Sequence, residues 1–237
     1  MVGHDHGGAV AQLLTAEHPE RIDRLVIADA EAYDNWPSRQ ERPFVRATQL
    51  PPLGDALLWA RSRRPLFRLT MARGNAVCDR SVLTPELLDA YIRANLSDRD
   101  RRAKTRRFLA GQLDPTHNQT RLELLDGLRR FDHPTLLLWA TDDPTFGPEW
   151  GKRLQADIPG VVRLELVHGA GHLLMEERPD QARAAGARPP RCCSPKEQPS
   201  RDTPGARPKQ SPCHGRRRLP LVPGRQAPCR WLCPMSR

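Results

Sequence analysis

The stretch Val2–Gly8 reads Val-Gly-His-Asp-His-Gly-Gly and runs directly into a helical segment that begins at Ala9. Gly3 and Gly7 lie two residues on either side of Asp5, which is the spacing of a strained strand-to-helix turn that exposes a nucleophile at its centre. Neighbours with Cβ atoms would clash at such a turn, so small residues are needed there. Serine usually occupies the centre, but a carboxylate can also act as a nucleophile and forms an ester intermediate. The stretch therefore predicts a short strand, a tight turn and a helix, with Asp5 as the candidate nucleophile.

Two other interpretations of this stretch remain open. Asp5 could simply cap the helix in a glycine-rich turn. Alternatively, His4 and His6 stand two residues apart, which could place both imidazoles on one face of a strand as metal ligands. Gly7, Gly8 and the immediate helix fit the turn better than a metal site, so we predict no metal.

Further along the chain, apolar runs of strand length alternate with helical segments. Ile22–Ala28, Pro134–Ala140 and Val161–Val167 are rich in apolar residues, as strands buried on both faces of a parallel sheet are. Ala9–His18 is helical in character, and so is Glu149–Asp157 between the last two strands. A strand, a helix and a strand in this order form a βαβ unit, which predicts a parallel sheet and an α/β fold class.

The middle of the chain, residues 38–131, contains no convincing strand. Thr84, Pro85 and Glu86 form a helix start, with an N-cap, a proline in the first turn and an acid near the positive end of the helix dipole. We predict a helical insertion that forms a lid, and we favour a solvated helix face over a binding patch for its many arginines. The candidate residues for lining a pocket under this lid, for which core packing is an equal alternative, are Trp36, Trp59 and Phe67.

Polar side chains follow the second and third of these strands directly. Thr141–Pro144 reads Thr-Asp-Asp-Pro after one strand, and His168–His172 reads His-Gly-Ala-Gly-His after the next. The chain order is then nucleophile, acid and histidine. Because catalytic groups of parallel sheets gather at the carboxyl ends of the strands, we expect all three to converge.

Together these segments resemble the α/β-hydrolase fold, and specifically its branch with an aspartate nucleophile, which includes epoxide hydrolases and haloalkane or haloacid-type dehalogenases. Besides the turn, the resemblance rests on HPERIDRLVI (18–27), LLLWATDDP (136–144) and HGAGHLLMEERPDQ (168–181), which are similar to the family's sixth, seventh and eighth strand regions. The resemblance covers about residues 1–182. It implies a parallel sheet with a helical cap.

The resemblance also implies a role for each matching residue. Asp5 would be the nucleophile, and His172 would be the base that activates water against the ester. Asp143 would orient His172, and the backbone N–H of His6 would be an oxyanion donor.

Several acidic residues could be the one that orients His172. Asp143 is preferred because the family's acid usually falls four residues after a tryptophan placed like Trp139. Asp142 is the adjacent alternative. Some dehalogenases place the acid after the sixth strand instead, where this chain offers Asp29, Glu31 and Asp34, with Asp29 at the strand end.

The expected reaction is hydrolysis of a small organic substrate, an epoxide, a halide or an ester, without a cofactor. Relatives often carry a halide-binding tryptophan at the position of His6, and epoxide hydrolases use cap tyrosines, for which only Tyr33 and Tyr91 are available here. The resemblance therefore leaves the reaction type open.

Relatives also have four strands and a His-Gly-x-Pro-like loop before the turn, and an apolar helix after the position of Asp180. The sequence shows none of these features. We therefore expect an N-terminally truncated hydrolase with an aberrant C-terminal tail and little activity. An inactive truncated hydrolase fragment is the alternative function. A basic-tailed protein associated with nucleic acid is a weaker alternative.

Charge is distributed unevenly along the chain. The net charge is +10, but residues 183–237 contain 13 Lys or Arg and only 2 acidic residues. The basic character therefore belongs to this tail, so a nucleic-acid partner is not expected for the body. The tail also holds 11 of the 24 prolines and 5 of the 6 cysteines, without the paired spacing of zinc sites, and predicts disorder.

We therefore divide the chain into a first core part (1–37), a helical cap (38–131), a second core part (132–182) and the tail (183–237). No run approaches 18 apolar residues and no secretory signal is visible, so we expect a cytoplasmic protein without a membrane span. The expected partner is a small-molecule substrate, and the oligomeric state cannot be inferred from the sequence.

Overall fold

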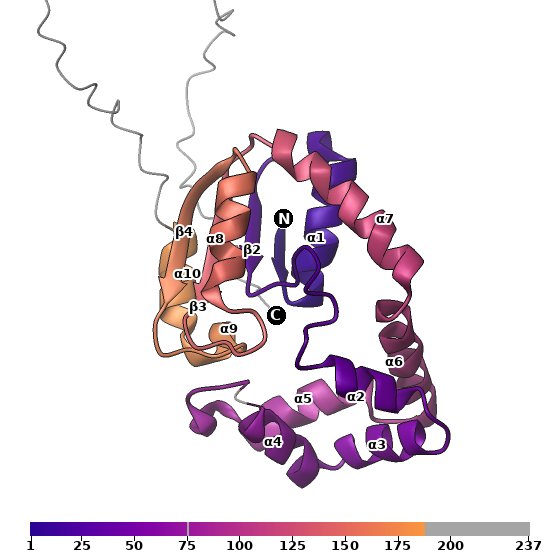
Figure 1. Ribbon diagram of the computed structural model, residues 1–237. Helices are drawn as coiled ribbons and strands as arrows, with labels where there is room; N and C mark the ends of the chain where they lie inside the picture. Colours follow the sequence, from indigo (N-terminus) through magenta and orange to yellow (C-terminus); the bar gives the residue numbers. More distant parts are fainter. Residues whose placement is uncertain (75, 188–237) are drawn as a thin grey trace, which may run out of the picture.

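The structure is a computed structural model that describes residues 1–74 and 76–187 (Figure 1). The predicted disorder of the basic tail concerns residues that lie, from 188 onward, outside this described part. Among the described helices, none combines the length and the apolar character that crossing a bilayer requires.

A parallel sheet of four strands forms the centre of the described residues. The strands lie side by side in chain order: β1 (Val2–His4), β2 (Leu25–Ala28), β3 (Thr135–Ala140) and β4 (Val161–Val167). The register pairs His4 with Ala28, Ala28 with Leu138, and Leu138 with Glu165. The predicted α/β fold class is therefore confirmed, and the carboxyl ends of all four strands meet at one edge.

β2 begins three residues later than the apolar run that predicts it. A short 3₁₀ turn, Pro19–Arg21, precedes it, and the Ile22 amide donates to the Pro19 carbonyl at 3.1 Å. Ile22 is buried in the core beneath the sheet although it lies outside the strand. Apolar character marks burial here rather than strand pairing.

Helices cover both faces of the sheet. α1 (His6–Glu17) and α8 (Pro148–Asp157) pack on one face, where Ile27, Leu137 and Trp139 are buried. The opposite face carries the other side chains of the same strands and is covered by the short α9 (Leu174–Glu177) and by α10 (Pro179–Ala187). This alternation explains why β2 and β3 are buried throughout, as predicted. β4 differs from the prediction, because it is only partly buried and contains Arg163 and Glu165, which form an ion pair at 3.2 Å.

α10 contradicts the expectation that no helix follows Asp180. The helix continues past residue 182 as far as Ala187, the end of the described residues. Ala182 and Ala185 are buried against the sheet, in the cluster that contains Val26 and Leu136. Because alanine supplies this packing, the segment lacks the large apolar residues whose periodicity predicts a covering helix.

Between β2 and β3 the chain forms a helical cap with a core of its own. Its helices lie together below the sheet in Figure 1: α2 (Arg42–Thr48), α3 (Leu53–Arg61), α4 (Arg64–Arg73), α5 (Pro85–Asn95) and α6 (Arg99–Gln112). Leu58, Phe67 and Leu88 are buried together in this core with Leu173, which follows His172. The described residues of 38–131 contain helices and no strand, as expected of a lid.

The last part of this segment returns to the sheet. α7 (Pro115–Leu125) and the 3₁₀ helix η3 (Asp126–Arg130) pack against α1 (Figure 1). Leu128 and Phe131 are buried in the core beneath the sheet. The helical insertion predicted for 38–131 therefore ends with residues that belong to the packing of the sheet.

The glycines around Asp5 differ in whether the surrounding atoms leave space for a side chain. A Cβ on Gly3 would lie 2.4 Å from the Gly7 carbonyl oxygen, and one on Gly8 would lie 2.3 Å from the Ala30 Cβ. A Cβ on Gly7 would meet nothing within 4 Å. Contrary to the spacing argument, Gly8 rather than Gly7 is the second position where a side chain is excluded.

Alanine substitutions test this close approach. We expect Gly3→Ala and Gly8→Ala each to lower the free energy of unfolding by about 1–3 kcal/mol, because the added methyl overlaps atoms that cannot move freely. Gly7→Ala is the matched control and should be neutral or stabilising, because alanine favours a helix by up to about 1 kcal/mol over glycine. Urea unfolding followed by circular dichroism measures all three, and equal destabilisation by Gly7→Ala would contradict the geometry.

Candidate active site

The turn between β1 and α1 holds Asp5 in an unusual backbone conformation, with φ 54° and ψ −129°. The Asp5 amide donates to the carbonyl oxygens of Ala28 and Asp29 at 3.3 and 3.1 Å. Its own carbonyl accepts from the amides of Gly8 and Ala9 at 2.9 and 3.2 Å. Asp5 occupies the N-cap position of α1, but its side chain makes no capping hydrogen bond to the helix, so the geometry gives no support to a capping role for this carboxylate.

His172 lies between two carboxylates at this edge of the sheet. Its Nδ1 is 2.9 Å from Oδ2 of Asp143, and its Nε2 is 3.7 Å from Oδ2 of Asp5. Nε2 of His4, at the end of β1, donates to the backbone carbonyl of His172 at 2.8 Å. The structure thus brings together the three side chains that the sequence analysis names as nucleophile, acid and base.

Asp143 is held in place by the backbone that follows it. Its Oδ1 accepts hydrogen bonds from the amides of Thr145 and Phe146 at 2.7 and 3.1 Å, which leaves Oδ2 for His172. The residue is buried. Its carboxylate therefore has a fixed orientation, as expected of a group that orients a histidine.

The competing acids point elsewhere. Asp142 accepts from the Thr141 hydroxyl at 2.6 Å and from the Gly169 amide at 3.2 Å. Asp34 is exposed and its nearest cation is Arg153, at 3.8 Å. The geometry therefore favours Asp143 over both.

Asp29 is buried near the site but does not bond to His172. Its Oδ1 accepts from the Ala140 amide at 2.8 Å, while its Oδ2 has no hydrogen-bond partner among the described residues. Burial, and then the negative charge of Asp143, raise the pKa of Asp29 to about 9. A carboxyl that is protonated at neutral pH cannot serve as the counter-ion of an imidazolium.

The negative charge of Asp5 and the positive charge of His172 each stabilise the ionised form of the other group. Burial disfavours the charged form of both groups, but contact with His172 and the charge of His6 bring the pKa of Asp5 down to about 2. Burial likewise opposes the imidazolium of His172, yet Asp143 and Asp5 raise the pKa of His172 well above its usual range. In the free protein the pair is therefore a carboxylate and an imidazolium at neutral pH.

His6, the first residue of α1, forms a second histidine–carboxylate pair. Its Nδ1 lies 2.5 Å from Oε2 of Glu31, whose side chain is fully buried. Burial opposes the charge, but Glu31 and then Asp5 raise the pKa of His6 to about 9. Burial also raises the pKa of Glu31, to about 7. From its position after the strand, Glu31 is expected only as an alternative acid, and no local motif predicts its pairing with His6.

One group among the described residues has metal-ligating atoms close together. Atoms of Asp5, His6 and Glu31 lie within 4.8 Å of one another. His6 and Glu31 are already hydrogen-bonded to each other, and Asp5 lies against His172. The alternative pairing of His4 with His6 is not formed, because His4 bonds to the His172 carbonyl instead.

A buried glutamate that the sequence analysis does not name connects the cap to the histidine loop. Oε1 of Glu177 accepts from the Gly171 amide at 2.7 Å. Oε2 accepts from the amides of Cys78 and Asp79 in the cap at 2.7 and 2.8 Å. Nearby, the Leu173 amide donates to the Ala76 carbonyl at 3.0 Å. These bonds fix the segment that contains His172 against the cap.

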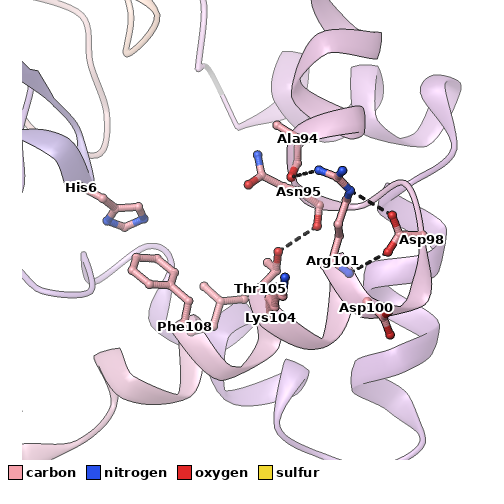
Figure 2. Close-up of a pocket in the computed structure, with 10 residues that line it drawn as sticks. His6, Ala94, Asn95, Asp98, Asp100, Arg101, Lys104, Thr105 and Phe108 are labelled. Atoms are coloured by element: carbon pink, nitrogen blue, oxygen red, sulfur yellow. Dashed lines mark hydrogen bonds and ion pairs between the residues drawn. The ribbon is translucent and has the colours of Figure 1, made fainter.

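The space beside Asp5 lies under the cap. A hollow of about 800 Å³ extends from His6 along α5 and α6. Figure 2 shows His6 next to Phe108, whose ring lies 4.8 Å from that of His6, with Thr105 farther along the wall. A smaller cavity of about 210 Å³ is lined by His6, Phe67 and Tyr91 among others. Both spaces reach the residue next to the candidate nucleophile.

The three aromatic residues expected to line the pocket differ in position. Phe67 lines the smaller cavity and is also part of the cap core. The ring of Trp36 lies 5.7 Å from that of His6. Trp59 is half exposed, and the guanidinium of Arg63 stacks on it at 4.3 Å.

The identity of the acid can be tested by titrating His172. Asp143→Asn and Asp5→Asn should each lower the pKa of His172, because each removes a negative charge that stabilises the imidazolium. Asp142→Asn should leave that pKa unchanged. Nitrogen-15 NMR of the histidine side chains measures the three values. If the pKa of His172 fell further in Asp142→Asn than in Asp143→Asn, Asp142 would replace Asp143 as the acid that orients His172.

Comparison with known proteins bears on the fold of the chain. A model of the alpha/beta hydrolase fold family matches residues 1–179. The chain is 28% identical over 182 residues to the uncharacterized hydrolase YugF of Bacillus subtilis, covering 76% of this chain and 60% of that protein. It is 25% identical over 200 residues to epoxide hydrolase 3 of Xenopus tropicalis, covering 76% of this chain and 49% of that protein. The chain thus spans about half to three fifths of the length of these relatives.

Among solved structures, the haloalkane dehalogenase DbeA of Bradyrhizobium elkani is similar, with a TM-score of 0.59 and 20% identity. The match covers 76% of this chain and 62% of DbeA, and at this identity it shows a shared fold. The family model matches well over half of the residues. The chain therefore belongs to the alpha/beta hydrolase fold family.

Proposed function

We propose that the chain is a hydrolase that acts on a small organic substrate through an ester formed on Asp5. The observation that carries this proposal is the position of His172, whose two ring nitrogens face Asp143 and Asp5 at 2.9 and 3.7 Å. Asp5 is presented by a turn at φ 54°, beneath the cap and next to a residue that lines both cavities. This arrangement provides a nucleophile, a base and an orienting acid in one place.

In the first step, an oxygen of the Asp5 carboxylate attacks an electrophilic carbon of the substrate. A carbon–oxygen bond forms, and the bond to the leaving group breaks with its electron pair. Because its pKa is about 2, Asp5 is ionised at neutral pH and is available as a nucleophile. His172, held by Asp143, stabilises this carboxylate before the attack.

Ester formation also prepares His172 for the second step. The ester has no negative charge, so one of the two carboxylates that raise the pKa of His172 is removed. The imidazolium then releases its proton more easily, to the leaving oxygen or to solvent, and neutral Nε2 accepts a proton from water. The resulting hydroxide adds to the ester carbonyl, and the bond between the carbonyl carbon and the substrate oxygen then breaks. His172 returns its proton to that oxygen, so the product leaves as an alcohol that keeps the original Asp5 oxygen.

The helix that follows Asp5 supports the second step. His6 is its first residue, and the first amides of a helix have no acceptor within the helix. The His6 amide is therefore proposed to donate to the oxygen that becomes negative when water attacks the ester.

The substrate class remains an epoxide, a halide or an ester. An epoxide or a halide gives the alkyl ester and the alcohol described above, whereas an ester substrate would expel its alkoxide, acylate Asp5 as an anhydride and be released as an acid. An epoxide hydrolase and haloalkane dehalogenases are among the similar proteins. Tyr91 lines the smaller cavity and donates to Glu176 at 2.8 Å, whereas Tyr33 donates to Asp157. Tyr91 is therefore the tyrosine better placed to assist a leaving oxygen.

Variants at Asp5 and His172 test the mechanism. Asp5→Asn should lower turnover of epoxides, haloalkanoates and p-nitrophenyl esters by roughly 10⁴-fold or more, as removal of a catalytic nucleophile does. His172→Gln should instead accumulate the ester, which is detected as a mass increase on the peptide that contains Asp5. Asp142→Asn is the control and should retain turnover.

Isotope labelling separates this mechanism from direct attack by water. In a single turnover in ¹⁸O-labelled water, the label should enter the Asp5 carboxylate and not the product. Label found only in the product would overturn the ester intermediate.

A further inference from the structure

Arg61, the last residue of α3, lies in the wall of the smaller cavity, which His6 and Tyr91 also line. Its guanidinium carbon is 5.0 Å from the ring centroid of Phe44 and 5.3 Å from that of Phe67. Both aromatic residues line the same cavity. Both rings lie within cation–π distance of the guanidinium, an interaction that does not use its N–H groups.

The guanidinium is not matched by a carboxylate. Within the described part of the chain, Arg61 forms neither a hydrogen bond nor an ion pair, whereas several cap arginines pair with aspartates: Arg64 with Asp89, Arg101 with Asp98 and Arg106 with Asp55. Burial lowers the pKa of Arg61, and the charge of Glu41 opposes this effect. Arginine stays protonated in proteins, so the cavity contains a cation with unused N–H donors.

Glu41 is the acidic residue that shares this cavity. Its carboxylate interacts with the Ser38 hydroxyl at 3.3 Å and forms no ion pair with Arg61. Burial, and then the negative charge of Asp5, raise the pKa of Glu41. Glu41 therefore weakens the positive potential of the cavity without occupying the donors of Arg61.

We propose that Arg61 binds the carboxylate of the substrate, so that the chain acts on small organic acids whose electrophilic carbon lies beside Asp5. A planar guanidinium can donate two parallel hydrogen bonds to a carboxylate. The cavity is about 210 Å³ and extends to His6, the residue after Asp5, which suits a short acid bound with its anionic end at Arg61. This inference deepens the proposed function and rests on it for the reaction, but the binding step can be measured without turnover.

Binding is measured on the full chain carrying Asp5→Asn, which is not expected to turn over substrate. The probes are butanoate, butanamide and methyl phosphate, titrated by calorimetry. Butanoate should bind at least 10-fold more tightly than butanamide, because charge-assisted bonds to arginine are strong in a partly buried site. Equal binding of the acid and the amide would overturn the proposal, and tighter binding of methyl phosphate would replace the carboxylate with a phosphate as the ligand.

Three further substitutions, each combined with Asp5→Asn, test whether the carboxylate binds at Arg61. Arg61→Gln should remove the preference for the acid. Arg63→Gln should keep it, because Arg63 stacks on half-exposed Trp59 and has the same charge. Glu41→Gln should strengthen butanoate binding severalfold, a gain that a folding defect cannot produce. Loss of the preference in Arg63→Gln, or weaker binding in Glu41→Gln, would contradict the assignment.

Kinetics then connect binding to the reaction. With Asp5 intact, Arg61→Gln should raise KM for 2-bromobutanoate about 10- to 100-fold and leave KM for 2-bromobutanamide unchanged. An equal change for both substrates would overturn the role of Arg61. If neither 2-bromobutanoate nor 2-bromobutanamide were turned over, the proposed function would be contradicted. Binding of the carboxylate by Arg61 would still be decided by the calorimetric measurements.

Discussion

The backbone of α1 lies directly against the backbone of β1 at the turn that holds Asp5. This contact leaves no space for a Cβ at Gly3 or Gly8, and it forces Asp5 to a positive φ. The same reversal places His6 at the start of the helix, where its ring faces the cap and its Nδ1 reaches Glu31. A turn without this close approach would move both Asp5 and His6 away from the loops that follow β3 and β4. The geometry of the whole site therefore depends on one contact between backbones.

The charges of the site are arranged around this turn. Asp5 and Asp143 share one imidazole, so the loss of either charge changes the basicity of His172. Asp29 lies close to both carboxylates, but burial and Asp143 keep it protonated at neutral pH. A third ionised carboxylate would hold the proton on His172 more firmly and oppose its release in the proposed hydrolysis. A neutral Asp29 thus lets the imidazole respond to the state of Asp5.

Much of this arrangement could be predicted because its signals are local. The glycines around Asp5, the apolar strands and the acid and histidine after them each occupy a few adjacent residues, and parallel strands bring their carboxyl ends together. The features that were missed depend on contacts between distant segments. Glu177 bonds to the amides of Cys78 and Asp79, and Glu31 pairs with His6, yet neither acid lies in a recognisable motif. α10 could not be predicted because its buried face consists of small residues, namely Ala182, Ala185 and Gly186.

The carboxylate of Glu177 ties the cap to the loop that contains His172. It joins the backbone at residues 78 and 79 of the cap to Gly171, next to His172, through buried hydrogen bonds. Separating the cap from the core on this side would break these bonds and displace His172 at the same time. The larger hollow, which runs from His6 along α6, is lined by none of these residues (Figure 2). A ligand that entered through this hollow would therefore leave the hydrogen bonds of Glu177, and with them the position of His172, intact.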